Sequence, residues 1–170
     1  MRHALATLLA LGLLAFAALP AVAGGKPEWA ANEPVDPFGF AAGEVCDFDL
    51  EIAFAVDTGH TISFPESNGS QLVIGAGHLV ITVTNFETNA SVTLNISGPG
   101  KLLFQGDKLS ISGGGPWLIF TFPGDAGGAG MWYTKGYVTL EIDLNSGAVP
   151  SLSLPHNSID VCELLGGHAA

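Results

Sequence analysis

Short runs of alternating apolar and polar residues, separated by glycine and proline, recur along most of this chain. The clearest run spans residues 46–56, where Phe48, Leu50 and Ile52 alternate with acidic or small residues. A period of two is typical of a β-strand that buries one face and exposes the other to solvent. No stretch after residue 23 shows apolar residues at helical spacing, so the pattern predicts an all-β fold.

Further β-rich runs follow at similar spacing, and the chain carries 23 glycines and 10 prolines that interrupt them. Residues 87–89 and 145–147 are typical of turns between strands. Many short strands without intervening helices predict an antiparallel β-sandwich, with a closed β-barrel as the alternative. We favour the sandwich because it accommodates irregular loops such as residues 124–130. The expected strands lie in residues 79–86, 91–97, 116–122, 137–144 and 149–154.

The first 23 residues have the organisation of a secretory signal peptide. A short positive start at Arg2 precedes an almost wholly apolar run, and Ala21-Val22-Ala23 matches the small residues that signal peptidase accepts. The alternative is a membrane-spanning helix, but the apolar run is shorter than the roughly 20 residues that a bilayer requires. We therefore expect cleavage after Ala23 and a secreted, extracellular product that is released and not anchored.

The remainder divides into three parts by composition. Residues 24–43 combine prolines and acidic residues without a regular period, which is typical of an extended leader. The leader contains the aromatic residues Trp29, Phe38 and Phe40. They either dock the leader onto the domain or form a contact surface for a binding partner. Residues 44–165 form the expected β-sandwich domain, and residues 166–170 form a C-terminal tail.

Cys46 and Cys162 are the only cysteines of the chain, and they lie at the two ends of the β-rich body. In an oxidising compartment two such cysteines are expected to pair, although free thiols or a metal pair are the alternatives. A disulfide here would connect the first strand to the last segment of the domain.

The chain is strongly acidic, with five Lys and Arg against 16 Asp and Glu and a net charge of −11. Removal of residues 1–23 takes away the single arginine and leaves four lysines against 16 acidic residues, a net charge of −12. Binding to nucleic acid or to anionic lipid requires clustered basic residues, so both partners are excluded. An acidic surface remains compatible with divalent cations or neutral sugars.

Two groups of carboxylates are candidates for a site. Asp47, Asp49 and Glu51 share the polar side of the first strand, and Glu141 and Asp143 would join them if their strands pair. Such a cluster could bind Ca²⁺, which takes oxygen ligands, or could provide the acid and base of glycoside hydrolysis. The alternative is a solvated acidic face that guards a sheet edge.

Three aromatic residues are candidates for ligand binding: Trp132, Tyr133 and Trp117. An exposed ring on a rigid sheet can stack on the apolar face of a sugar. The alternative is that these rings fill the core of the sandwich, which is the expectation for Trp117 in particular.

Short motifs at both ends and in the middle of the chain also resemble those of a group of small secreted actinobacterial all-β proteins. These motifs are Phe40-Ala41-Ala42-Gly43-Glu44-Val45-Cys46-Asp47-Phe48, Thr82-Val83-Thr84-Asn85, Asn95-Ile96-Ser97-Gly98-Pro99, Gly115-Pro116-Trp117 and Asp160-Val161-Cys162. The resemblance implies an exported all-β domain with its two cysteines paired. It implies no activity and no catalytic residues.

The chain carries no nucleophile elbow, zinc-protease motif or phosphate-binding loop. We therefore expect a secreted binding or cell-envelope-associated module without a required cofactor, whose partner is a polysaccharide or an envelope protein. The alternatives are a small carbohydrate-active hydrolase that uses paired carboxylates and a structural protein that assembles with itself.

Overall fold

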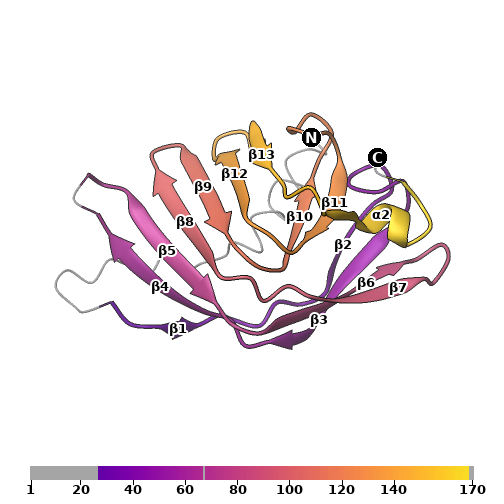
Figure 1. Ribbon diagram of the computed structural model, residues 1–170, viewed down its shortest axis with the longest axis horizontal. Coiled ribbons are helices and arrows are strands. Elements are labelled where there is room, and N and C mark those ends of the chain that lie inside the picture. Colours follow the sequence, from indigo (N-terminus) through magenta and orange to yellow (C-terminus); the bar gives the residue numbers. More distant parts are fainter. Residues whose placement is uncertain (1–26, 67, 169–170) are drawn as a thin grey trace.

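The computed structural model describes residues 27–66 and 68–168, so the expected signal peptide lies outside the described residues (Figure 1). No helix in this part of the chain is long and apolar enough to cross a membrane. The elements are β1 (Ala30–Ala31), β2 (Phe38–Phe40), β3 (Leu50–Asp57), β4 (His60–Pro65), β5 (Gln71–Ala76), β6 (Leu79–Asn85), β7 (Ser91–Asn95), β8 (Gly100–Gln105), β9 (Lys108–Gly113), β10 (Trp117–Thr121), β11 (Gly130–Thr134), β12 (Val138–Asp143), β13 (Ser151–Ser153), β14 (Ile159–Asp160) and α2 (Val161–Leu164).

The strands form three antiparallel sheets that do not close into a barrel, which confirms the expected sandwich. A seven-stranded sheet has the order β1-β4-β5-β8-β9-β12-β13, a four-stranded sheet has the order β2-β3-β6-β7, and a three-stranded sheet has the order β10-β11-β14. Every strand pairing is antiparallel.

Most strands come in consecutive pairs that bend from one sheet into another. Thus β3 continues into β4, β5 into β6, β7 into β8, β9 into β10, β11 into β12 and β13 into β14, while hairpin turns join one pair to the next. Because β8 and β9 pair but β7 and β10 do not, the seven-stranded sheet divides beyond the bends into two separate sheets (Figure 1).

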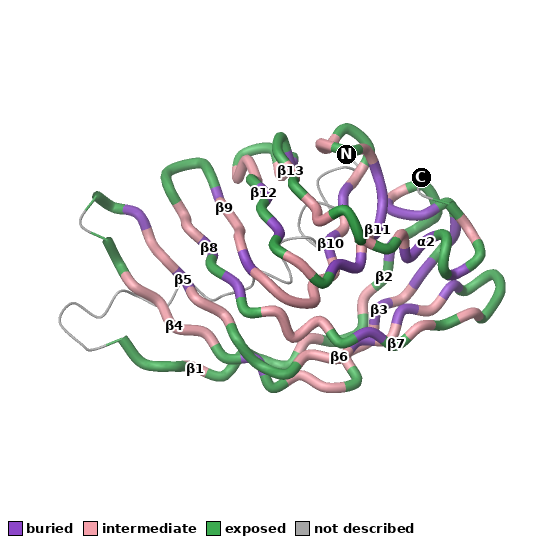
Figure 2. The backbone as a smooth tube through the Cα atoms, viewed as in Figure 1, coloured by how far each residue is buried: buried purple, intermediate pink, exposed green. Residues whose placement is uncertain are grey.

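The three-stranded sheet is the middle layer of the molecule. On one side Met131 and Tyr133 pack with Ile52, Ile81 and other buried residues of the four-stranded sheet. On the other side Ile119 packs with residues of β9, β12 and β13. In Figure 2 the buried segments concentrate where the four-stranded sheet lies against β11, whereas β4 and β5 are mostly of intermediate exposure.

The first run of alternating residues keeps its expected burial but is only partly a strand. Phe48 and Leu50 are buried while Asp47 and Asp49 are exposed, yet regular pairing starts only at Leu50. The preceding residues form turns and bends that carry Cys46 to its partner. The expected alternation in residues 91–97 and 137–144 is also present, with the apolar side chains facing the core.

The leader and the tail both dock on the domain within the described residues. β1 pairs with β4 and β2 pairs with β3, and Phe40 is buried while Trp29 is 55% exposed. At the other end the His168 backbone N–H donates to the Asp47 carboxylate at 2.9 Å, and the Asp47 N–H donates to the His168 carbonyl at 3.0 Å. The two segments are therefore continuous with the β-sandwich.

Cys46 and Cys162 form the expected disulfide, with their Cα atoms 5.5 Å apart. Both residues are fully buried in the core between the four-stranded and three-stranded sheets. The bond joins the segment before β3 to the short helix α2, whose first turn is capped by the Asp160 carboxylate. The bond therefore closes the end of the domain that lies opposite β4 and β5 of the seven-stranded sheet.

Candidate functional site

Trp117 is partly buried and packs against the core. Its ring lies against Gly98, Gly100 and Gly113, where a Cβ atom on any of the three glycines would clash with the indole. The Nε1–H donates weakly to the Gly114 carbonyl at 3.4 Å. The three glycines thus allow a tryptophan to fill the bend between β9 and β10, and its ring faces inward.

Trp132 and Tyr133 are also packed into the structure. Tyr133 is only 8% exposed, and its hydroxyl donates to the Asn95 carbonyl at 3.1 Å, which links β11 to β7. Trp132 is half-buried and packs against the cluster that contains Ile119 and Val138. Both rings therefore make packing contacts with neighbouring strands.

The candidate carboxylates lie in two separate places. Asp47, Asp49 and Glu51 belong to β3 and the segment before it, whereas Glu141 and Asp143 belong to β12. β3 pairs with β2 and β6, and β12 pairs with β9 and β13, so the condition for one joint site is not met. Within the described residues no group of three or more His, Cys, Asp or Glu side chains is arranged to hold a metal ion.

Several of these carboxylates accept hydrogen bonds from the backbone. Asp49 accepts from the Ala42 N–H at 2.7 Å, and Asp143 accepts from the Asn145 and Ser146 N–H groups at 2.9 and 3.0 Å. They stabilise turns, which explains their positions without a ligand.

The Asp143 turn gives a prediction about pH. Hydrogen bonds from the Ser146 and Asn145 backbone hold the pKa of Asp143 below its ordinary value, with a smaller contribution from Lys108. Since the folded-state pKa is depressed, the stabilisation is present above the unfolded-state pKa and is lost as the pH falls through the folded-state pKa. In an NMR titration we expect the Asn145 and Ser146 amide signals to move in this acidic range. The Asp143→Asn variant should abolish the transition, and its persistence there would contradict the assignment.

A different surface emerges from the register of the seven-stranded sheet. Residues that face each other across neighbouring strands lie on the same side of a sheet, and residues two apart on one strand do so as well. Two adjacent cross-strand rows therefore share one side, which we call the outer face. The first row is Ile62, Ile74, Lys101, Ser112, Thr139 and Ser153, and the second is Phe64, Leu72, Leu103, Ser110, Glu141 and Ser151.

The opposite side of the same strands faces the core. Its central row is Ser63, Val73, Leu102, Ile111, Leu140 and Leu152, of which Val73, Leu102 and Leu140 are buried. The middle-layer sheet packs against part of this side. The outer face is consequently the side that is directed away from the interior.

The outer face has two halves of different chemistry. Over β4, β5 and β8 it presents five large apolar side chains of intermediate exposure, none of which belongs to the three buried clusters of the described chain: Ile62, Phe64, Leu72, Ile74 and Leu103. Over β9, β12 and β13 it presents hydroxyl groups and Glu141. Lys101 lies at the boundary, opposite Ile74 on one side and Ser112 on the other.

Charge on the outer face is nearly balanced in an otherwise acidic molecule. Lys101 and Glu141 are its charged members, and the next row adds Lys108 opposite Asp143. The other 14 of the chain's 16 acidic residues lie elsewhere. The outer face therefore does not share the strong negative charge of the protein as a whole.

Sequence reasoning missed most of this surface for a physical reason. In the segment His60–Pro65 the alternation of Ile62 and Phe64 with Thr61 and Ser63 is the pattern of a strand whose apolar side faces a core. The structure places these two apolar residues in the outer rows instead. The surface is identified from the register between paired strands. The sequence of one strand does not contain this information.

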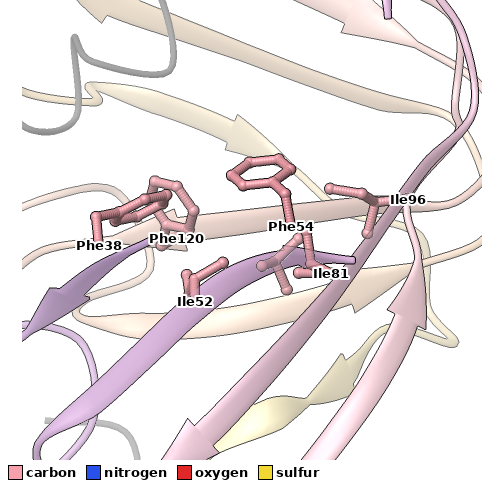
Figure 3. Close-up of a pocket in the computed structure, with 7 residues that line it drawn as sticks. Phe38, Ile52, Phe54, Ile81, Ile96 and Phe120 are labelled. Atoms are coloured by element: carbon pink, nitrogen blue, oxygen red, sulfur yellow. The ribbon is translucent and has the colours of Figure 1, made fainter. Parts of the chain in front are cut away.

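A small apolar hollow of about 50 Å³ opens between the four-stranded and three-stranded sheets (Figure 3). It is lined by Phe38, Ile52, Phe54, Ile81, Ile96, Leu118 and Phe120. The lining contains no titratable side chain, so the hollow offers no group for acid–base chemistry.

Comparisons with models of known protein families, with curated proteins and with solved structures find no match to this chain.

Proposed function

We propose that this protein is a non-enzymatic binding module that recognises an extended polysaccharide through the outer face of its seven-stranded sheet. The proposal rests on the two cross-strand rows of the outer face. Their side chains are mostly apolar over β4, β5 and β8 and mostly carry hydroxyl groups over β9, β12 and β13. Sugar rings combine apolar C–H faces with hydroxyl groups, so a polysaccharide matches both halves of such a surface.

The dimensions of the outer face favour a linear ligand. Neighbouring strands are about 4.8 Å apart, so rows that extend from β4 to β13 span about 24 Å. A polymer that lies perpendicular to the strands would meet one side chain of each row at every strand. This regular repeat suits a chain of similar units better than a single small molecule.

An exposed aromatic ring adds to this surface. Tyr137 is 67% exposed and precedes β12, two positions before Thr139. Side chains two positions apart in extended chain point the same way, so Tyr137 continues the line of Thr139 and Glu141. We propose that the ring of Tyr137 stacks on a sugar. It takes the role that the sequence suggested for Trp117, Trp132 and Tyr133, whose rings pack against other residues.

The cellular location belongs to the same proposal. A fully buried disulfide fits an oxidising compartment such as the extracellular space. The expected signal peptide would deliver the domain there, where polysaccharides of the cell envelope are accessible. The acidic remainder of the surface keeps such a module soluble.

Retention on insoluble polysaccharides tests the proposal. Purified protein is incubated with peptidoglycan, cellulose and chitin, and the bound fraction is measured for the wild type and for Thr139→Glu. Thr139 is exposed at the centre of the hydroxyl half, between Ser112 and Ser153, so a carboxylate there should block close approach of a sugar. We expect at least a tenfold loss of affinity, about 1.4 kcal/mol, and a smaller loss in Tyr137→Ala.

Thr93→Glu is the matched control, because Thr93 is also an exposed strand threonine but lies on β7. It adds the same charge away from the outer face and should bind like the wild type. Equal losses in the two threonine variants would show a general charge effect, and the absence of retention on any polysaccharide would remove the proposed ligand.

A further inference from the structure

The leader is attached to the domain by few backbone pairings. β1 contributes two residues and β2 contributes three, and the segment between them includes Pro34 and Pro37 and adds one hydrogen bond, from the Asn32 N–H to the Gly59 carbonyl at 2.9 Å. A segment with so few hydrogen bonds opens at a lower free energy than the strands it covers. The leader can therefore separate locally from the edge of β3 and β4.

Two phenylalanines of β2 hold the leader between the sheets. The Phe40 ring lies 5.3 Å from that of Phe120 and 5.7 Å from that of Phe122, both from the β10 side. The Phe38 ring lies 6.4 Å from Phe54 on β3 and 6.5 Å from Phe120. β2 thus fills a groove between β3 and β10 with the extended segment Phe38–Phe40.

The fit of the leader in this groove is incomplete. The hollow of about 50 Å³ lies beside Phe38, and Phe54 and Phe120 also line it (Figure 3). Unfilled apolar space lowers the dispersion energy that an inserted segment gains. The leader is accordingly held less firmly than a fully packed strand.

The disulfide marks the boundary between the leader and the covalently anchored part of the domain. Cys46, six residues after Phe40, is covalently joined to Cys162. Residues 41–45 between them form a turn, in which the Ala41 N–H donates to the Glu44 carboxylate at 2.9 Å and the Gly43 N–H donates to the Cys46 carbonyl at 2.8 Å. When the leader leaves its groove, the chain beyond Cys46 remains anchored.

We propose that the leader exchanges between two copies of this chain, so that β1 and β2 of each copy occupy the groove of the other. The occupant is indicated by the groove itself, which already accepts the segment Phe38–Phe40 with its aromatic rings and backbone pairing. A second copy carries the same segment and makes the same contacts, so exchange costs no interface that the single copy has. Only the turn at residues 41–45 must change, from closed to extended.

The length of this turn limits the geometry of the exchanged dimer. The six residue steps from Phe40 to Cys46 reach at most about 22 Å when fully extended. The Phe40 end of each groove must therefore lie within that distance of Cys46 of the other copy. Exchange consequently gives a compact dimer.

The Gly43→Ala substitution tests the exchange by straining the closed turn alone. Gly43 has φ of +88°, and no atoms lie within 4 Å of the position that a Cβ would take there, so alanine adds backbone strain and no clash. The extended turn of the dimer does not require this conformation. We expect Gly43→Ala to raise the association constant about tenfold or more, because two turns are relieved in each dimer, as measured by light scattering over a wide concentration range.

Gly106→Ala is the matched control, since Gly106 has φ of +60° and equally open surroundings in the turn between β8 and β9. It should leave association unchanged. A second variant, Ala31→Cys with His60→Cys, locks the leader in place, because facing residues of antiparallel strands are within reach of a disulfide. The locked protein should remain monomeric.

A mixture of isotopically light and heavy protein gives the direct readout, because exchange produces a dimer of mixed mass in native mass spectrometry. Dimers that form from isolated monomer in which the engineered disulfide between positions 31 and 60 is already closed within one copy would overturn the proposal by showing a different interface. A monomer at every concentration in Gly43→Ala, or an equal response to Gly106→Ala, would overturn it as well.

Discussion

Loss of the Cys46–Cys162 bond is expected to lower the free energy of unfolding by about 5 kcal/mol. The two cysteines are 116 residues apart in sequence, and in the chain-entropy model a cross-link over so long a loop removes much of the entropy of the unfolded chain. Free energies of unfolding of single domains are typically about 5–15 kcal/mol, so the loss would remove a large share of the total.

Urea unfolding of the Cys46→Ala, Cys162→Ala double variant, followed by tryptophan fluorescence, measures this effect. Alanine avoids leaving two polar thiols in a fully buried site. The wild type in the presence of a reductant serves as a second comparison, since it keeps both sulfur atoms. A double variant with the same unfolding midpoint as the oxidised wild type would show that the bond does not stabilise the fold.

Gly113→Ala is expected to destabilise the protein by about 1–3 kcal/mol, the usual range for an overpacked core. A Cβ atom at residue 113 would meet both the Pro99 carbonyl oxygen and the Trp117 ring. The Pro99 oxygen belongs to the backbone and cannot rotate away, and the indole also lies against Gly98 and Gly100. The bend from β9 to β10 would have to open to accept one methyl group.

Gly114→Ala is the neighbouring control, because no atoms lie within 4 Å of a Cβ at that position. Both variants change one glycine to alanine in the same bend, so the difference between their unfolding free energies isolates the clash. Thermal or urea unfolding gives this difference directly. Similar stabilities for the two variants would show that the indole moves without cost.

The strands with regular alternation were predictable from the sequence. Residues 91–97 and 137–144 place their apolar side chains inward as expected, because each of these segments has one buried face. The strands β4, β5, β8, β9 and β11 were not anticipated. Their pairing depends on neighbours that are distant in sequence, which local propensity does not record.

The candidate site was less predictable than the fold. Of the residues that the sequence singled out, Glu141 lies on the outer face, whereas Tyr133 is buried and Trp117 and Trp132 are partly buried against a core cluster. A tryptophan near a glycine-rich segment is compatible with exposure or with close packing against backbone. The Trp117 ring packs against the backbone because three glycines lie beside it. These glycines come together only after β8 and β9 pair.

The bends that carry each strand from one sheet into another also bear on how fast this protein folds. β3 and β4 are consecutive in the chain but belong to different sheets, and the same is true of β11 and β12. None of the three sheets of the described chain is therefore built from one continuous stretch of residues. Pairings such as β11 with β14, and the closure of Cys46 on Cys162, join segments that are far apart in the chain. Proteins dominated by such non-local contacts cross their folding barrier in milliseconds to seconds. During that interval unpaired strand edges are exposed, so early formation of the Cys46–Cys162 bond would shorten their exposure.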